Sequence, residues 1–325
     1  MFNPTPNTTG SATLNHLITT FWSRTALDVL RKKTIFKMLT DSHILSRRNG
    51  KTIQFWRPTV FGVNTTNATE GSVDSPLQLT TGTVSATVGQ YIDWLNFSDL
   101  LKDTALDDVL VTGGKEIGYR GALTDDSLIR NEFDSQQAST DVSMLGSFYS
   151  VDDLVHVRSL MSGTDVEPKN GPYFPGLAHP YVTFDLVRDP AAAGFVDIVK
   201  QGANTPGNER LFTFEDRGFV ARIGGVELWE STNVTVSGAS PNLKYRAYYS
   251  GKQGLATIDL EGRGPRRVSD PKVEQFNIIS QTHGPDKSDP AGQIAGSVAY
   301  NFVDVAKTFD VNRLKSHEVP SSIVP

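Results

Sequence analysis

The chain has 325 residues, of which 31 are basic and 36 acidic, giving a formal net charge of −5 and a sequence pI near 5.7. This balance argues against a dedicated nucleic-acid-binding protein, which usually carries a basic patch and a high pI. The lack of cysteine excludes disulfides and thiolate metal sites.

The length suits roughly two domains and allows a sizeable core. Residues 1–10 are polar and lack the basic start and apolar stretch of a secretion signal. No window of the sequence offers the roughly 20 apolar residues that a membrane-spanning helix needs. We therefore expect a soluble protein that is made inside a cell.

Residues 1–22 are predicted to form an extended arm that ends in the aromatic pair Phe21-Trp22, because prolines, asparagines and threonines discourage regular structure. A helix is predicted next, over residues 23–48. Ser23 can cap it, and the basic pair Arg47-Arg48 ends it before Gly50. Its expected apolar face consists of Leu27, Leu30, Ile35, Met38 and Leu39.

Two strand patterns then flank a polar stretch. Apolar and polar residues alternate over Lys51–Arg57, and the even positions from Val84 to Trp94 form one apolar face. The intervening residues 59–83 are rich in threonine, asparagine, serine and glycine. The pattern predicts a long two-stranded hairpin with a weakly apolar tip. Because an isolated hairpin is marginal in water, we expect another surface, such as a neighbouring subunit, to support it; a floppy surface loop is the alternative.

A long helix is predicted from about Ser98 to about Phe133, with one stripe at spacings of three and four residues. The stripe consists of Leu106, Leu110, Gly113, Ile117, Gly121, Thr124 and Leu128. Each glycine inside a helix costs about 1 kcal/mol relative to alanine. Either a sheet packs closely along the glycines, or the helix is kinked or interrupted near Gly113-Gly114.

The second half of the chain mixes both kinds of pattern. It predicts a short helix over Val151–Met161, a turn-rich connection over Pro168–Pro175, a strand over Tyr181–Leu186 and a helix from Asp189-Pro190 to about Lys200. Strands are predicted at Gly218–Trp229, Lys244–Tyr249, Gly254–Leu260, Val273–Ile279 and Ile294–Phe302. The fold class is therefore α+β, without an internal repeat.

Searches for catalytic motifs find none that is complete. Gly50-Lys51-Thr52 resembles the end of a phosphate-binding loop, but Leu45 holds the position where that motif needs glycine. Neither a G-x-S-x-G nucleophile turn nor an H-E-x-x-H metal helix occurs, and the six histidines are scattered. The best local candidate for an anion contact is the basic cluster of Arg263, Arg266 and Arg267, although a solvated or subunit-contacting loop explains it better.

Several local strings stand in an order that carries a family resemblance. They are Gly50-Lys51-Thr52-Ile53-Gln54-Phe55, Glu70-Gly71, the alternating stretch over 84–94, His179-Pro180, Arg188-Asp189, the run over 218–226, and Ser288-Asp289-Pro290-Ala291-Gly292-Gln293. With them the chain resembles the major capsid proteins of tailed bacteriophages, in particular a group known from podoviruses. The resemblance covers about residues 22–315.

The resemblance implies an α+β fold of the HK97 type. The strings near the N-terminus resemble the family's E-loop, a hairpin that reaches over an adjacent subunit, and the predicted helix over 98–133 resembles its spine helix. The implied parts are an N-terminal arm (1–22), an N-terminal helix (23–48), an E-loop β-hairpin (49–96), a peripheral domain with the spine helix (97–150), an axial domain (151–280) and return strands to the peripheral domain (281–325).

For function, the resemblance implies a structural coat protein that is not an enzyme and has no catalytic residue, metal or cofactor. It would self-assemble in the bacterial cytoplasm into hexamers and pentamers of an icosahedral shell enclosing dsDNA. Implied partners are further copies, a separate scaffolding protein, a portal, an optional decoration protein and non-specifically contacted DNA, but no membrane. Candidate contacts between subunits are Phe21, Trp22, Lys51, Phe55, Arg57, Glu70, Val73, Leu77, Leu79, Arg263, Arg266 and Arg267.

Two alternatives stay open at this point. An encapsulin-like compartment shares the fold but encloses a cargo enzyme, so cargo would co-purify and packaged DNA would be absent. A non-enzymatic binding module of a phage tail or fibre would instead give a monomer or trimer with ligand affinity and no curved assemblies.

Overall fold

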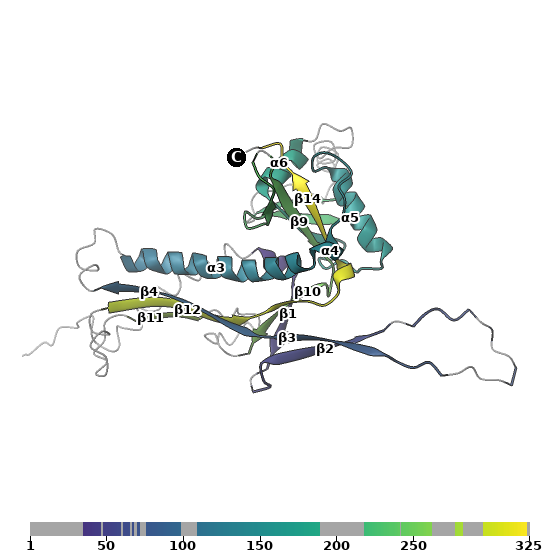
Figure 1. Cartoon of the computed structure of the whole chain (residues 1–325), viewed down its shortest axis with the longest axis horizontal. Coiled ribbons are helices and arrows are strands. Elements are labelled where there is room, and N and C mark those ends of the chain that lie inside the picture. The colour runs from purple at the N-terminus through teal and green to yellow at the C-terminus, as the bar shows by residue number, and fades with distance from the viewer. Residues whose placement is uncertain are drawn as a thin grey trace, which may run out of the picture.

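The structure is a computed structural model that describes residues 35–46, 48–59, 61–65, 67, 70–71, 76–98, 109–188, 218–240, 242–261, 277–281 and 295–323. The predicted arm (1–22), the first part of the helix predicted over 23–48 and the helix predicted from Asp189 lie outside these residues. The described residues form a long layer of helix and sheet, a compact body beside one end of it, and a projecting hairpin (Figure 1).

The long layer consists of helix α3 (Val109–Ser135) on a sheet of three antiparallel strands. These are β11 (Asn277–Gln281), β12 (Ala295–Asp304) and β4 (Gly89–Ser98), with β12 in the middle. Figure 1 shows α3 running along this sheet. Between helix and sheet lies an apolar cluster of Ile117, Ala122, Val298, Tyr300 and Phe302.

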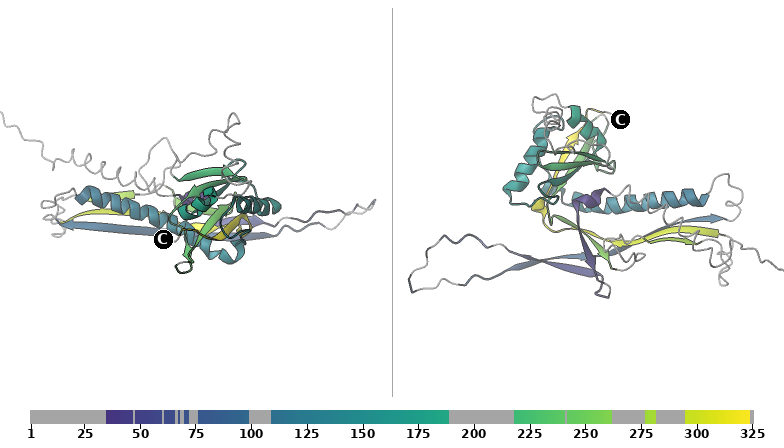
Figure 2. Two further views of the ribbon diagram at one scale, coloured as in Figure 1. Left: turned by 90° about the horizontal axis from the view of Figure 1, so that it is seen from above. Right: turned by 180° about the vertical axis from the view of Figure 1, so that it is seen from behind.

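The compact body is built on a six-stranded sheet in the order β14, β9, β5, β7, β6, with β8 pairing beside β9. Its strands are β14 (Leu314–Pro320), β9 (Lys244–Ser250), β5 (Phe174–Ala178), β7 (Val226–Glu230), β6 (Phe219–Ile223) and β8 (Val236–Ser237). Helices α5 (Val151–Gly163) and α6 (Pro180–Arg188) belong to the same body (Figure 2). Its core also takes in Phe36 and Phe133, which reach it from outside the sheet.

Two smaller sheets complete the fold, and the second of them is the projecting hairpin. Strand β1 (Asp41–Leu45) runs parallel to β10 (Leu255–Leu260), which also pairs with β13 (Ala306–Thr308). Strands β2 (Thr52–Pro58) and β3 (Thr81–Thr87) pair antiparallel, from Thr52 opposite Thr87 to Pro58 opposite Thr81. Short helical turns complete the described elements: η1 (Phe36–Leu39), α4 (Gln137–Thr140) and η3 (Val311–Arg313).

Many sequence predictions are confirmed. Strand β2 matches the one predicted over 51–57, helix α5 the one over 151–161, and β9, β10 and β12 lie where strands were expected. The strand predicted over 83–94 is divided into β3 and β4. The strand predicted over 218–229 is divided into β6 and β7. The second division occurs because Gly224 and Gly225 adopt positive φ angles of 62° and 83°, which glycine tolerates best.

Helix α3 is continuous through Gly113-Gly114, so the predicted interruption is wrong and the close-packing alternative is correct. A side chain at Gly113 would collide with the ring of Phe97 on β4. The start expected at about Ser98 is not tested, because Ser98 itself ends β4. Residues 99–108 lie outside the described part.

Two further predictions are wrong. The helix predicted over 23–48 does not continue past η1, because residues 41–45 form β1 and hydrogen-bond to β10. The strand predicted over 181–186 is helix α6. Its buried residues Val182, Thr183 and Leu186 follow helical spacing, and Pro180 suits the first helical position.

The two neighbouring glycines of α3 provide a stability test. Replacing Gly114 by alanine should stabilise the protein, because alanine favours helix and no other atom lies within 4 Å of the added methyl group. Replacing Gly113 by alanine should make Phe97 move. We expect Gly113→Ala to be less stable than Gly114→Ala by about 1–2 kcal/mol in urea unfolding. Equal stabilities would contradict close packing at Gly113.

A second test uses His317 of β14, which is fully buried and whose two ring nitrogens have no hydrogen-bond partner among the described residues. Burial lowers its pKa from the ordinary 6.5 to about 4. The unfolded chain therefore takes up a proton at a pH where the folded chain does not. The free energy of unfolding should therefore fall as the pH drops from about 6.5 to about 4. His317 should account for up to about 3 kcal/mol of this loss.

In His317→Leu this contribution should disappear, so urea unfolding measured across that pH range should show a shallower loss of stability. The matched control is His43→Leu, which changes a histidine outside the buried core of the compact body. Identical slopes in wild type and His317→Leu would show that His317 does not contribute.

Candidate interaction surface

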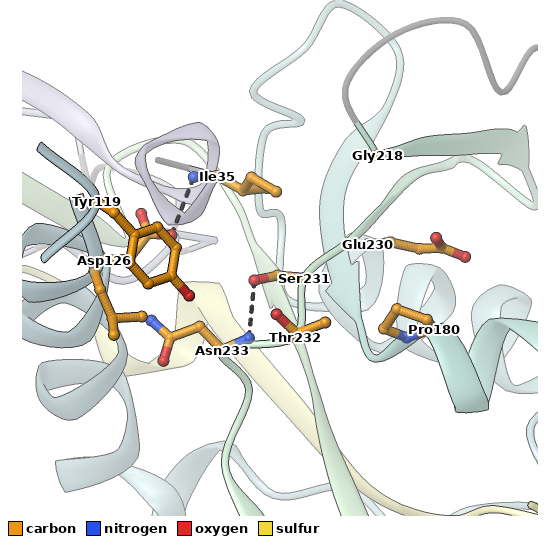
Figure 3. Close-up of a pocket in the computed structure, with 10 residues that line it drawn as sticks. Ile35, Tyr119, Asp126, Pro180, Gly218, Glu230, Ser231, Thr232 and Asn233 are labelled. Carbon is orange, nitrogen blue, oxygen red and sulfur yellow. Dashed lines mark hydrogen bonds between the residues drawn. The ribbon is translucent and has the colours of Figure 1, made fainter. Parts of the chain in front are cut away.

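One pocket lies between α3 and the compact body (Figure 3). It has a volume of about 240 Å³ and no histidine in its lining. The Asp126 carboxylate accepts the backbone N–H groups of Ile35 and Phe36, both at 3.2 Å. The Ser231 hydroxyl accepts the backbone N–H of Asn233 at 3.2 Å. Both polar groups are thus used for structural contacts, and the pocket pairs no nucleophile with a base.

Metal and membrane sites are likewise missing from the residues that the structure describes. No group of three histidine, cysteine, aspartate or glutamate side chains there could hold a metal ion. None of the described helices is both long and apolar enough to cross a membrane. The arrangement therefore directs attention to surfaces that could bind another protein.

The hairpin of β2 and β3 is fixed at its base by its own chain. The Phe55 ring lies 4.3 Å from that of Phe309 and 5.1 Å from that of His43, measured between centroids. One Arg57 guanidinium nitrogen lies 2.9 Å from a carboxylate oxygen of Asp310. These contacts are half exposed, so they orient the hairpin and add only modest stability.

Beyond this base, the hairpin projects away from both α3 and the compact body in all three views (Figures 1 and 2). Four large apolar side chains on it are mainly exposed: Trp56 (74%), Val63 (90%), Leu77 (74%) and Leu79 (61%). Phe61 is also exposed. We call Trp56, Phe61, Val63, Leu77 and Leu79 the hairpin patch. Their own chain leaves them in water, as at surfaces that bind another protein.

A second apolar surface lies on the sheet face that α3 does not cover. Tyr91 and Phe97 of β4 pack toward the cluster under α3, whereas Ile92 and Trp94 point to the opposite face and are mostly exposed. The alternation follows from the two-residue repeat of a strand. The helix thus buries one face of the sheet, while Ile92 and Trp94 stay exposed on the other.

The predicted contact residues have different positions in the structure. Lys51, Glu70, Leu77 and Leu79 are exposed on the hairpin. Phe55 and Arg57 contact their own chain at its base, as described above. The others lie outside the described residues: Phe21, Trp22, Val73, Arg263, Arg266 and Arg267.

The sequence interpretation missed Trp56, Phe61 and Val63 of the hairpin patch. A signal existed for Trp56, because it shares a strand face with Thr52 and Gln54, opposite the face of Ile53 and Phe55. A tryptophan on the polar face of an alternating strand indicates a binding surface. Phe61 and Val63 stand in a polar stretch with no comparable periodicity.

Comparison by sequence gives no match, either to a protein-family model or to a curated protein. Comparison by structure finds the capsid of Ralstonia phage GP4, at a TM-score of 0.64 and 15% identity over 90% of this chain and 92% of that chain. The capsid of cyanophage P-SCSP1u has a TM-score of 0.60 and 13% identity over 89% of each chain.

The SrpI encapsulin of Synechococcus elongatus PCC 7942 is also similar, at a TM-score of 0.52 and 12% identity over 87% of each chain. These similarities extend over nearly the whole of each chain and confirm the expected HK97-type fold. At such low identity they show the fold alone. The narrower podovirus-type assignment stays a prediction.

Proposed function

We propose that this chain is the major capsid protein of a tailed bacteriophage and self-assembles into the hexamers and pentamers of an icosahedral shell around dsDNA. The observation that carries the proposal is the hairpin patch, which projects beyond its own core on a fold shared with phage capsid proteins. In this role the protein is structural and not catalytic, and it resides in the virion.

The energetics of the hairpin patch favour binding to another copy of the chain. Burying one large apolar side chain contributes about 1.5–3 kcal/mol. Part of this gain is offset by the conformational entropy that residues at the contact lose when they become ordered. In a closed symmetric shell every copy both gives and receives the same contact, so a modest contact is repeated many times. The fixed base of the hairpin reduces the ordering cost, because Phe55 and Arg57 already orient β2 and β3.

The charge of the chain is consistent with a wall around DNA. A net charge of −5 means that the chain carries no overall positive charge that would attract phosphates. Each additional contact between a lysine or arginine and a phosphate would strengthen non-specific binding and slow the movement of DNA during packaging. We therefore propose that contact with the packaged DNA is weak and non-specific.

Other partners belong to the same proposal. We propose a separate scaffolding protein, together with a portal, as the resemblance to phage capsid proteins implies. A decoration protein would be an addition to this set. Efficient formation of uniform shells from this chain alone would contradict the need for a scaffold.

The similarity to SrpI supports a second candidate, an encapsulin-like compartment shell. The two candidates differ in their contents, not in their fold. Particles isolated from the natural source should contain dsDNA if the first is correct. A co-purifying cargo enzyme and no packaged DNA would support the second.

A double variant tests the hairpin patch directly. In Leu77→Asp with Leu79→Asp, two exposed side chains become charged, and burying them at a contact between subunits would then be strongly unfavourable. We expect shells and capsomers to be lost in electron microscopy and sedimentation, while the circular dichroism spectrum and urea midpoint stay close to wild type.

The matched control is Leu77→Met with Leu79→Met, which keeps both side chains apolar and should still assemble. Normal shells from the aspartate variant would contradict the proposal that another copy covers these residues. A loss of assembly in the methionine variant as well would show that the effect is not one of polarity.

A further inference from the structure

Two asparagine–glycine pairs occur in the sequence, Asn49-Gly50 and Asn170-Gly171. In such a pair the backbone nitrogen of glycine can attack the side-chain carbonyl carbon of the preceding asparagine. Glycine favours this attack because it has no side chain to obstruct the approach and permits unusual backbone angles. The two pairs share this local chemistry, so a large difference in their reactivity would come mainly from the folded structure.

The first pair lies in the turn between β1 and β2. Arg48, Asn49 and Gly50 are all exposed. Gly50 has a φ of 86°, and no atom outside the adjoining residues lies within 4 Å of where its Cβ would be. Among the residues that the structure describes, none hydrogen-bonds to the Asn49 side-chain amide or accepts the Gly50 N–H. Both reacting groups are therefore open to water.

The strands on either side of this turn are anchored. The carbonyl oxygen of Leu45, at the end of β1, accepts the backbone N–H of Glu261 at 2.9 Å. The carbonyl oxygen of Lys51, just before β2, accepts the backbone N–H of Val88 at 2.9 Å. Residues 48–50 can therefore change their backbone and side-chain angles without breaking a described contact between strands.

The second pair is held in place by hydrogen bonds. The Asn170 side-chain amide donates to the Glu227 carboxylate at 3.0 Å, and Glu227 is itself buried and paired with Arg222 at 3.1 Å. The backbone N–H of Asn170 donates to the Tyr173 carbonyl at 3.0 Å, and its carbonyl accepts the Tyr173 N–H at 3.1 Å. Turning the Asn170 side chain toward the nitrogen of Gly171 would break the bond to Glu227.

We propose that Asn49 is a site of spontaneous deamidation and that the fold protects Asn170 from the same reaction. In the first step the Gly50 nitrogen loses its proton and bonds to Cγ of Asn49. The bond from Cγ to the side-chain nitrogen breaks, and ammonia leaves, so that a five-membered succinimide ring forms. Water then adds to either ring carbonyl and opens the ring to aspartate or isoaspartate. The reaction needs water but no oxidant, reductant or catalytic residue.

The products change the connection between β1 and β2. Both carry a negative charge at residue 49, between Arg48 and Lys51 in the sequence. Isoaspartate also adds one carbon atom to the main chain, so the turn that leads into the hairpin becomes longer. The modification depends on this chain alone and does not rest on the proposed function.

Incubation of the purified full chain tests the proposal. The folded protein is kept at mildly alkaline pH, where a backbone N–H loses its proton more readily, and samples are digested at acidic pH to stop the reaction. Mass spectrometry of the peptides that contain Asn49 and Asn170 gives the fraction converted at each site. We expect Asn49 to convert at least about tenfold faster than Asn170, which corresponds to about 1.4 kcal/mol in activation free energy.

The matched control is the same chain unfolded in urea. There Asn170 has lost its hydrogen bonds to Glu227 and Tyr173, so the two sites should convert at rates within about threefold of each other. A second control is Asn49→Gln, in which attack by Gly50 would have to close a larger ring. Its peptide around residue 49 should stay unconverted over the same period.

Equal rates at the two sites of the folded chain, or faster conversion at Asn170, would overturn the proposal. So would a folded chain in which Asn49 stays intact while the unfolded chain reacts there. A tenfold difference that persists in urea would show that the local sequence decides, and would contradict protection by the fold. The measurement uses dissociated chains, so its outcome is independent of the assembly test on Leu77 and Leu79.

Discussion

The structure depends on helix α3, because its second half binds the separate parts of the chain to one another. Asp126 holds the start of η1, and Glu132 accepts hydrogen bonds from the ammonium group of Lys307 and the backbone N–H of Thr308, both in β13. Asp134 accepts Arg246 and Tyr248 of β9 at 3.0 Å each. The same helix covers the long sheet through Gly113 and Ile117. One rigid element therefore positions the sheet relative to the compact body.

This arrangement explains how a hairpin without a core of its own can project in a defined direction. Strand β3 leads directly into β4, which α3 holds in place, and Phe55 packs on Phe309 just after β13. The frame thus fixes the base of the hairpin, while the side chains of the hairpin patch stay exposed. In a shell, rigid placement lets identical contacts close with symmetry.

The sequence predicted this fold where a repeating pattern was strong. The alternation over 51–57 and the spacing along α3 located the hairpin and the long helix. Prediction from the sequence failed where contacts with distant parts of the chain decide the local structure. Residues 41–45 form a strand because β10 offers its edge, and β5 was missed because Phe174–Ala178 is buried throughout and shows no alternation. The same limit applies to function, since the sequence indicated Leu77 and Leu79 but not Val63.

Assembly requires, as we propose, that another copy of the chain covers the hairpin patch. Electron cryomicroscopy of particles assembled from the full chain can show this cover directly. We expect closed icosahedral shells in which Trp56, Val63, Leu77 and Leu79 are buried against an adjacent subunit. A particle in which these side chains remain in solvent, or a chain that stays monomeric with and without its scaffolding protein, would contradict the claim.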